Sequence, residues 1–420
     1  MPDNSHIDSL VEHLFRHESG KMVAVLSRIL GLQNLEAAQD IVQDTLIKAL
    51  HTWKSGNLPD NPAGWLYKTA KNKAIDLVRR EHTFQKLAPD YAYILNSDFA
   101  LSSAFHKVFM EDEIGDSQLR MMFACCHPEI PIESQIALTL RTLGGLSTSE
   151  IASAFLTSED TITKRIYRAK EKFRTEDIQM SVPQGEALPK RLEAVLKSIY
   201  LLFREGYHSS HPDQLIREDL CQEAMRLCFI LTEHVLTAKP SSHALMALMC
   251  FQASRLKARL DDNGHIVLIR YQDRGKWYKP LINKGFHYLE RASEPFEVST
   301  YHLEALIASL HASAKSFETT EWKMIYEFYS MLQKLEPNPI VAMNKAIAAA
   351  YAIGFEHALK QLNAISGLEN HPAYLASLGE IYFELGELEL AKVKFQSAVE
   401  STDSEPVKEL FRSKIHNCLT

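Results

Sequence analysis

The sequence predicts an all-α protein with several domains. Apolar residues recur every three or four positions through most of the 420 residues, the spacing that places side chains on one face of a helix. A β-like pattern occurs only at Leu260 to Arg270, where Asp262-Asn263-Gly264 is a hairpin signal before an apolar run. Near the C-terminus, one helical pattern returns after 33 residues. A chain of this length is too long for a single hydrophobic core.

The first predicted domain covers residues 7 to 82 and contains three long helices. The first helix begins near Ile7 and ends at Gly31, and the second covers Glu36 to Trp53. The third covers Gly64 to about Glu81. The loop between the second and third helices contains residues that are expected to stop the helices on either side, namely Gly56, Pro59 and Pro62.

Aromatic and basic residues alternate on the third helix. Its cations exceed its anions by about three, and Trp65 and Tyr67 lie among them. Aromatic rings between cations suit unstacked bases and phosphates. A soluble helix that packs Trp65 into a core explains the same pattern, so both interpretations stay open.

A stretch of low periodicity, Thr83 to Gly115, follows this helix. It contains Pro89 and scattered acidic residues, including a run at Glu111 to Glu113. We expect a linker between two domains.

A helix-turn-helix is predicted within Glu133 to Arg174. One helix ends at Gly144-Gly145, and a short helix then begins at Ser147, which forms a capping box with Glu150. After a turn at residues 156 to 158, Thr157 and Asp160 repeat the capping pattern before the last helix.

The last helix has one apolar and one basic face. The apolar stripe is predicted to be buried and consists of Ile162, Ile166, Ala169 and Phe173. From Thr161 to Glu176 there are six cations and two anions, although the whole chain has a net charge of −7. Such a helix suits the major groove of DNA. An ordinary amphipathic helix with a solvated basic face is the alternative.

The composition changes from Ser181 onward, where a helical body of about 230 residues begins. The 33-residue repeat pairs Pro339, Ala346 and Ala358 with Pro372, Gly379 and Ala391. Small residues at helix crossings, with Tyr and Phe between the helices, are typical of tetratricopeptide repeats. Two copies do not make a stable solenoid, so the helices predicted at 299–314 and 322–335 should stack on them.

Several classes of protein and site are excluded by the sequence. There is no apolar run long enough for a membrane helix and no signal peptide, so we expect a cytoplasmic protein. The six cysteines form no CxxC pair, which fits a reducing compartment. Cys125-Cys126-His127 cannot chelate one ion alone, because adjacent helical residues point in different directions; we expect buried thiols there and at Cys221 and Cys228. We expect no metal site and no cofactor.

Three segments in this order resemble the extracytoplasmic-function sigma factors of bacterial RNA polymerase. They are AQDIVQDTLIKAL, NPAGWLYKTAKNKAIDLVRRE and the helix-turn-helix. The stretch DSQLRMMFACCHPEIPIESQIALTLRTLGGLSTSEIASAFL, with YLLFREGY and YQDRGKW further on, is similar to the group that carries a long C-terminal extension with tetratricopeptide repeats. The resemblance implies a sigma region 2 domain (1–82), a linker (83–115), a sigma region 4 domain (116–178), a helical extension (179–335) and tetratricopeptide-like repeats (336–420).

The resemblance also implies partners and site residues. The partners are core RNA polymerase, promoter DNA and a protein or peptide bound by the tetratricopeptide region. The residues expected to face polymerase are Asp40, Gln43, Asp44 and Thr45. Those expected at the −10 element are Trp65, Tyr67, Lys68, Lys71, Asn72 and Arg79. Those expected at the −35 element are Ser158, Thr161, Thr163, Lys164, Arg165, Arg168 and Lys172. Tyr167 and Lys170-Glu171-Lys172 depart from the usual pattern, so no promoter sequence is transferred.

Three functions compete. The first is a sigma factor whose extension, from about Ser181, regulates it in cis by covering the Arg165–Arg168 face or the Asp40–Asp44 face. The second is a helix-turn-helix regulator with a tetratricopeptide sensor that acts without polymerase, although such a regulator has no use for the N-terminal domain. The third is an enzyme in the extension, using Arg255, Arg259, Asp261, Asp273 and Arg274. Buried ion pairs explain those residues equally well, and no nucleophile–base pair supports catalysis.

Overall fold

The computed structural model describes residues 4–80, 107–155, 157–209, 215–293 and 298–419. Within these ranges the fold is all-α, as predicted, and no β-strand forms. Most of the expected linker lies outside the described residues, and its last five positions, Glu111 to Gly115, are already helical. The expected hairpin is reduced to one antiparallel bridge between Leu260 and Ile266, because a 3-10 turn, η4 (Ile269–Tyr271), ends the extended segment.

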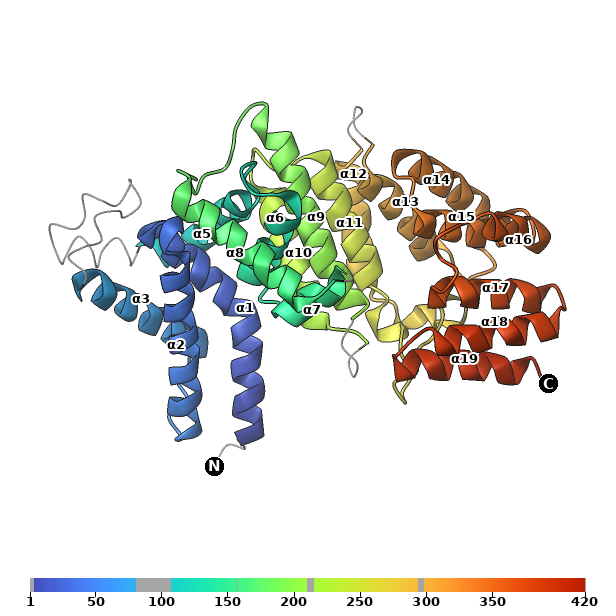
Figure 1. Cartoon of the computed structure of the whole chain (residues 1–420), viewed down its shortest axis with the longest axis horizontal. Coiled ribbons are helices and arrows are strands. Elements are labelled where there is room, and N and C mark those ends of the chain that lie inside the picture. The colour runs from blue at the N-terminus through green and yellow to red at the C-terminus, as the bar shows by residue number, and fades with distance from the viewer. Residues whose placement is uncertain (1–3, 81–106, 156, 210–214, 294–297, 420) are drawn as a thin grey trace. The chain divides into compact units, whose positions relative to one another are not determined.

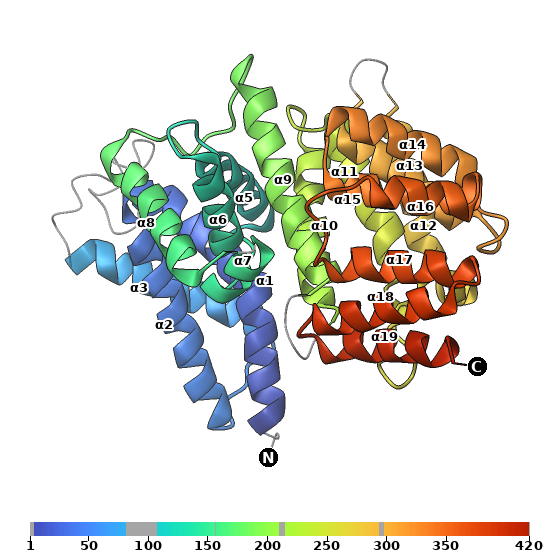
Figure 2. The same cartoon turned by 45° about the vertical axis from the view of Figure 1, so that its right-hand side comes forward.

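The chain divides into two compact units, which are considered separately. Unit 1 comprises residues 1–206 and 219–236, and unit 2 comprises residues 207–218 and 237–420. Their elements can be followed by label and colour in Figures 1 and 2.

Unit 1 begins with the three predicted helices, α1 (Asn4–Leu30), α2 (Leu35–Lys54) and α3 (Pro62–Arg80). A 3-10 turn, η1 (Leu32–Asn34), joins the first two. The expectation that Pro62 stops a helix is wrong. Pro62 is the first residue of α3, where proline loses no hydrogen bond, and the Asn61 side chain accepts from the Gly64 N–H at 2.9 Å.

The predicted helix-turn-helix is present in unit 1. It follows α5 (Glu111–Cys125) and comprises α6 (Ile132–Thr142), α7 (Thr148–Ala154) and α8 (Glu159–Thr175). The capping box of Ser147 and Glu150 is confirmed, with hydrogen bonds of 2.6 and 3.2 Å. The second cap is Ser158, whose hydroxyl accepts from the Thr161 N–H, and not Thr157 as predicted. Thr157 donates its own N–H to the carbonyl of Ala152 and so belongs to the preceding turn.

Two further helices complete unit 1, α9 (Ala187–Tyr207) and α10 (Glu218–Glu233). Arg191 on α9 donates to the backbone carbonyl of Phe123 on α5. A Cβ added to Gly144 would lie 3.2 Å from a Leu202 methyl, so α9 packs closely on the loop before α7. The first helices of the extension therefore share a core with the helix-turn-helix domain. The predicted burial of all four thiols, at Cys125, Cys126, Cys221 and Cys228, is confirmed.

Unit 2 is built from packed helix pairs. Its first part contains α11 (Pro240–Ala253), α12 (Lys279–Arg291), α13 (Thr300–Ser313) and α14 (Trp322–Leu335). The 3-10 turns η3 (Leu256–Ala258), η4 and η5 (Arg274–Lys276) lie between α11 and α12. Helix α11 packs on both α12 and α13.

The second part of unit 2 contains α15 (Pro339–Ala352), α16 (Phe355–Asn363), α17 (Pro372–Glu384), α18 (Leu388–Glu400) and α19 (Glu405–Asn417). Helices α17 and α18 begin 33 residues after α15 and α16, which matches the sequence repeat. Figure 2 shows α17, α18 and α19 side by side, and α18 packs on both of its neighbours. A Cβ on Gly379 would lie 2.8 Å from the Phe395 ring, so the predicted close crossing of α17 and α18 is confirmed.

Metal-binding clusters and membrane-spanning helices are both absent from the described residues. No group of three or more His, Cys, Asp or Glu side chains there is arranged to hold a metal ion. Likewise, none of the described helices is long and apolar enough to span a membrane.

Candidate nucleic-acid interface

Helix α8 has the two predicted faces. Ile162, Ile166, Ala169 and Phe173 are all buried, which confirms the apolar stripe. On the opposite side, Thr163, Lys164 and Arg168 are exposed and Thr161 is half-buried beside its cap Ser158. The helix thus holds one face in the domain core and presents hydroxyl and cationic groups on the other. This is the arrangement of a helix that reads the major groove.

The cations of this face differ in the contacts that they form within the protein. Lys164 pairs with Asp160 at 2.6 Å, and Lys172 pairs with Glu176 at 3.0 Å, both one turn apart on α8. The Arg165 guanidinium lies over the Phe155 ring, 5.8 Å from its centroid. Arg168 is exposed and forms no ion pair with any residue that the structure describes. Arg168 is therefore the cation that can reach a new partner without breaking an existing pair.

The C-terminal end of α8 contacts the start of α2. Lys170 donates to Gln39 at 2.8 Å and lies 3.7 Å from Glu36, and Arg174 forms an ion pair with Glu36. Burial lowers the pKa of Lys170, whereas the Glu36 carboxylate raises the pKa of Arg174. Two of the six cations of the basic face are therefore held by α2. The sequence did not predict these contacts, because they join residues more than 130 positions apart.

The region 2-like and region 4-like segments also contact each other directly, because α1 packs on α5 and on the end of α6. Arg28 on α1 bridges Glu113 and Asp116 on α5 at 2.8 and 3.0 Å. At Gly20 on α1, an added Cβ would lie only 2.5 Å from the backbone oxygen of Leu143, just after α6. The two segments share a tight interface within unit 1.

Helix α3 presents some of its expected DNA-binding residues to solvent and holds others in contacts. Lys68, Asn72 and Arg79 are exposed, and Lys71 is half-buried. Trp65 is also half-buried and meets Trp53 edge-on, with ring centroids 5.5 Å apart. The Tyr67 hydroxyl donates to the Glu18 carboxylate on α1, and burial raises the pKa of Tyr67. Tyr67 is thus directed towards α1 in this structure, although Trp65 keeps part of its surface accessible.

The expected polymerase-binding residues of α2 separate into two groups. Asp40, Gln43 and Asp44 are exposed, and Asp44 pairs with Lys73 at 2.9 Å. Thr45 is fully buried, and its hydroxyl donates to the carbonyl of Ile41 at 2.7 Å. This corrects the expectation that Thr45 faces a partner. Its side chain lies on the opposite, core-facing side of the helix.

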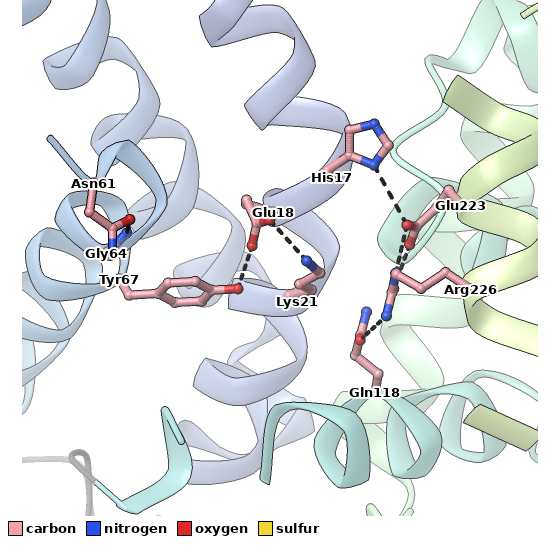
Figure 3. Close-up of polar contacts among 9 residues, drawn as sticks. All are labelled: His17, Glu18, Lys21, Asn61, Gly64, Tyr67, Gln118, Glu223 and Arg226. Atoms are coloured by element: carbon pink, nitrogen blue, oxygen red, sulfur yellow. Dashed lines mark hydrogen bonds and ion pairs between the residues drawn. The ribbon is translucent and has the colours of Figure 1, made fainter. Parts of the chain in front are cut away.

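Two sets of polar contacts meet α1 in Figure 3: one links Tyr67 of α3 to Glu18, and the other links His17 to α10 and α5. Arg226 on α10 holds Glu223 with two hydrogen bonds, of 2.8 and 2.6 Å, and donates a third to Gln118 on α5 at 2.8 Å. His17 on α1 lies 3.9 Å from the same carboxylate. Burial raises the pKa of Glu223 and lowers that of His17. We call the Glu223–Arg226 pair, with Gln118, the α10 brace.

The sequence contains a signal for the α10 brace. Glu223 and Arg226 lie among the apolar, buried residues Leu220, Ala224 and Leu227. A charged pair three residues apart within such a pattern indicates charges satisfied in the interior.

Family models match three segments of the chain. "Sigma-70 region 2" matches residues 14–83 and "Sigma-70, region 4" matches residues 120–173. A "Family of unknown function (DUF6596)" matches residues 191–293, which include α9 and α10.

Relatives of two kinds are similar to the chain. The "Uncharacterized protein R00370" of Rhizobium meliloti is 34% identical over 370 residues, which cover 87% of this chain and 86% of that protein. The RNA polymerase sigma-H factor of Pseudomonas aeruginosa is 31% identical over 34% of this chain and 77% of its own length. The corresponding figures for the ECF RNA polymerase sigma-E factor of Haemophilus influenzae are 30%, 36% and 78%. No solved structure matches the chain.

Sigma region 2 precedes sigma region 4 along the chain, and the two sigma factors named above align with it over 77% and 78% of their own lengths. The chain therefore belongs to the extracytoplasmic-function sigma factors, the promoter-binding initiation subunits of RNA polymerase, and it carries a C-terminal extension.

Proposed function

We propose that this sigma factor reads the −35 element with the exposed face of α8, contacts the −10 element with α3, and binds polymerase through α2. The support for α8 is the exposed Arg168 opposite a buried stripe. The support for α3 is its exposed Lys68, Asn72 and Arg79 beside a half-buried Trp65. Asp40, Gln43 and Asp44 offer an exposed acidic and amide surface for polymerase.

We also propose that unit 1 is a closed form of these sigma regions. The names of the two elements place them about 25 base pairs apart, which is ~85 Å along B-form DNA at ~3.4 Å per base pair. In unit 1, Arg174 of α8 instead forms an ion pair with Glu36 of α2. One chain cannot keep this contact and occupy both elements, so the two regions must separate on the promoter. The Arg174–Glu36 contact is the observation that carries this proposal.

The extension is proposed to control this opening in cis. Its helix α10 supplies Arg226 to Gln118 of α5, and the same guanidinium keeps Glu223 near His17 of α1. The α10 brace therefore touches both the region 2-like and the region 4-like segments. A covalent tether maintains it at a high effective concentration, so even weak docking is populated.

The helix pairs of unit 2 are proposed to form a tetratricopeptide-like surface for a protein or peptide partner. The support is the 33-residue offset between α15–α16 and α17–α18, together with the close crossing at Gly379. Such a partner would give the extension a signal to transmit, because stacked repeats present extended binding surfaces.

Run-off transcription with core RNA polymerase tests these proposals on the full chain and on fragments 1–182 and 1–236. Fragment 1–182 lacks α9 and α10, so it exposes to water the surfaces of α5 and of the Gly144 loop that these helices contact. We expect it to unfold at a lower temperature and to give less transcript than the full chain. Fragment 1–236 keeps both helices and should retain polymerase binding.

Three results would count against the proposals. More transcript from fragment 1–182 than from the full chain would contradict the structural role of α9 and α10, and would favour simple occlusion by the extension. Equal transcript from fragment 1–236 and the full chain would contradict control by unit 2. Failure of the full chain to bind core polymerase would favour a helix-turn-helix regulator that acts alone.

A further inference from the structure

Unit 2 contains a large cavity that promoter recognition does not use. Its volume is about 600 Å³. The lining comes from four parts of unit 2. They are the residues His208, Ser209, Leu215 and Ile216, the irregular segment 259–271, residues between Phe317 and Phe355, and the segment that contains α17 to α19. Residues far apart in the sequence thus converge on one space within a single unit.

Aromatic rings form one wall of the cavity. The Trp322 ring lies 4.8 Å from that of Phe317 and 4.7 Å from that of Tyr351, measured between centroids. Phe355 extends the series, 5.7 Å from Tyr351. Tyr271, at another edge, keeps 61% of its surface exposed. These rings offer flat apolar surfaces against which a second aromatic system can stack.

Four charged residues of the lining form two ion pairs along α17, and a further cation, Arg259, donates to the Tyr207 carbonyl and lies over the Tyr207 ring. Glu384 forms an ion pair with Arg270, and Glu380 pairs with Lys414 of α19 at 2.7 Å. The Lys414 ammonium also lies 5.3 Å from the centroid of the Tyr271 ring. Because each of these two carboxylates already has a cation, the wall at α17 offers a ligand hydrogen-bonding groups but no net charge. A charged ligand would have to displace one member of a pair.

The size and lining of the cavity, which is partly open to solvent, are those of a ligand site. Small-molecule sites typically measure about 300–1,000 Å³ and combine an apolar lining with a few polar groups. The cavity of unit 2 has this size and this composition.

We propose that this cavity binds an uncharged, predominantly aromatic small molecule. The ligand stacks on the Trp322–Tyr351 wall and reaches the paired carboxylates of α17 with hydrogen-bond donors. This goes beyond the proposed sigma function, and its test measures binding without polymerase, so that the two can fail separately.

The probe for this proposal is N-phenyl-1-naphthylamine, an uncharged aromatic dye whose fluorescence rises in apolar sites. The full chain should bind it saturably, with one site per chain. The anionic relative 8-anilinonaphthalene-1-sulfonate has the same rings and one negative charge. It should bind at least about tenfold more weakly, because nothing in the paired wall compensates its sulfonate.

Two matched tryptophan variants locate the site. Ser377 lines the cavity on α17, and its hydroxyl donates to the Ala373 carbonyl at 2.7 Å. Ser397 on α18 makes the equivalent bond to Val393 at 3.0 Å but does not line the cavity. Ser377→Trp should weaken binding of the uncharged dye more than tenfold, with a melting temperature no lower than that of the wild type. Ser397→Trp should bind the dye as the wild type does.

Several outcomes would overturn the proposal. Absence of saturable binding by the wild-type chain would do so, as would undiminished binding by Ser377→Trp. Equal loss in the two variants would show that the dye binds elsewhere or reports a general disturbance. Tighter binding of the sulfonate than of the uncharged dye would reject the class of ligand.

Discussion

Replacing Arg226 by alanine should lower the free energy of unfolding of unit 1 by about 3 kcal/mol. The change removes the cation from Glu223, whose side chain is only 4% exposed, and it removes the hydrogen bond to Gln118. An uncompensated buried charge is among the costliest single changes in a folded protein. We take the lower end of the usual range because the Arg226 side chain is itself 30% exposed. Chemical denaturation of the full chain, monitored by circular dichroism, measures the effect.

The loss of unfolding free energy caused by Arg226→Ala should also depend on pH. Burial raises the pKa of Glu223, and Arg226 opposes that shift by stabilising the carboxylate. A carboxyl whose pKa is higher in the folded than in the unfolded state adds to the free energy of unfolding at pH values below its unfolded-state pKa. This contribution is lost as the pH rises through its folded-state pKa. Without Arg226 the pKa rises further, so the penalty should be larger at about pH 8 than at about pH 5.

The matched control for this pH dependence is the same change in a Glu223→Gln background. Because this background has no buried carboxylate to be left without a cation, Arg226→Ala should lower the free energy of unfolding less there, and the effect should not depend on pH. An equal, pH-independent cost in both backgrounds would mean that Arg226 acts by packing alone, and that the α10 brace is not electrostatic.

Arg168→Ala should weaken promoter binding by about 1–3 kcal/mol if the side chain pairs with a guanine edge. In that case, discrimination should relax at one base pair of the −35 element. A phosphate contact should instead weaken binding to all sequences alike and reduce the salt slope by about one. Fluorescence anisotropy of labelled promoter DNA with the reconstituted holoenzyme, at several salt concentrations, separates the two. Arg165→Ala should have a smaller effect, because Arg165 already rests on Phe155.

Arg120→Ala is the matched control for the DNA-binding prediction. It removes the same charge from the same domain, but Arg120 lies on α5 and pairs with Asp116 at 2.7 Å. Promoter affinity should change little in this variant. If Arg168→Ala leaves promoter binding unchanged, or if Arg120→Ala weakens it equally, α8 is not the reading helix.

The elements of the fold were predictable where local rules determine them. The apolar stripe of α8 and the capping box at Ser147 follow from spacing alone, and both are present. Local rules also explain the errors. The rule that proline ends a helix fails at Pro62, because proline is well suited to the first turn of a helix, and the capping rule fits Thr157 as well as the neighbouring Ser158.

The site was less predictable than the fold, because its contacts join distant segments. The exposure of Asp40 and Asp44 followed from helical periodicity, but the burial of Thr45 depends on which helices cover α2. The pairing of Glu36 with Arg174 and the reach of Arg226 to Gln118 depend on tertiary packing. A sequence alone gives no distance between such residues, so these contacts could be recognised only in the structure.

The distance between α2 and α8, measured by fluorescence energy transfer, tests the central claim most directly. The six natural cysteines are buried, so His51→Cys on α2 and Thr175→Cys on α8, both at exposed positions, can be labelled selectively. The free chain should show efficient transfer, which should fall when core polymerase and promoter DNA are added, because the two regions then separate by tens of ångströms towards ~85 Å. Unchanged transfer in a complex that still makes the promoter-specific transcript would contradict the opening of unit 1.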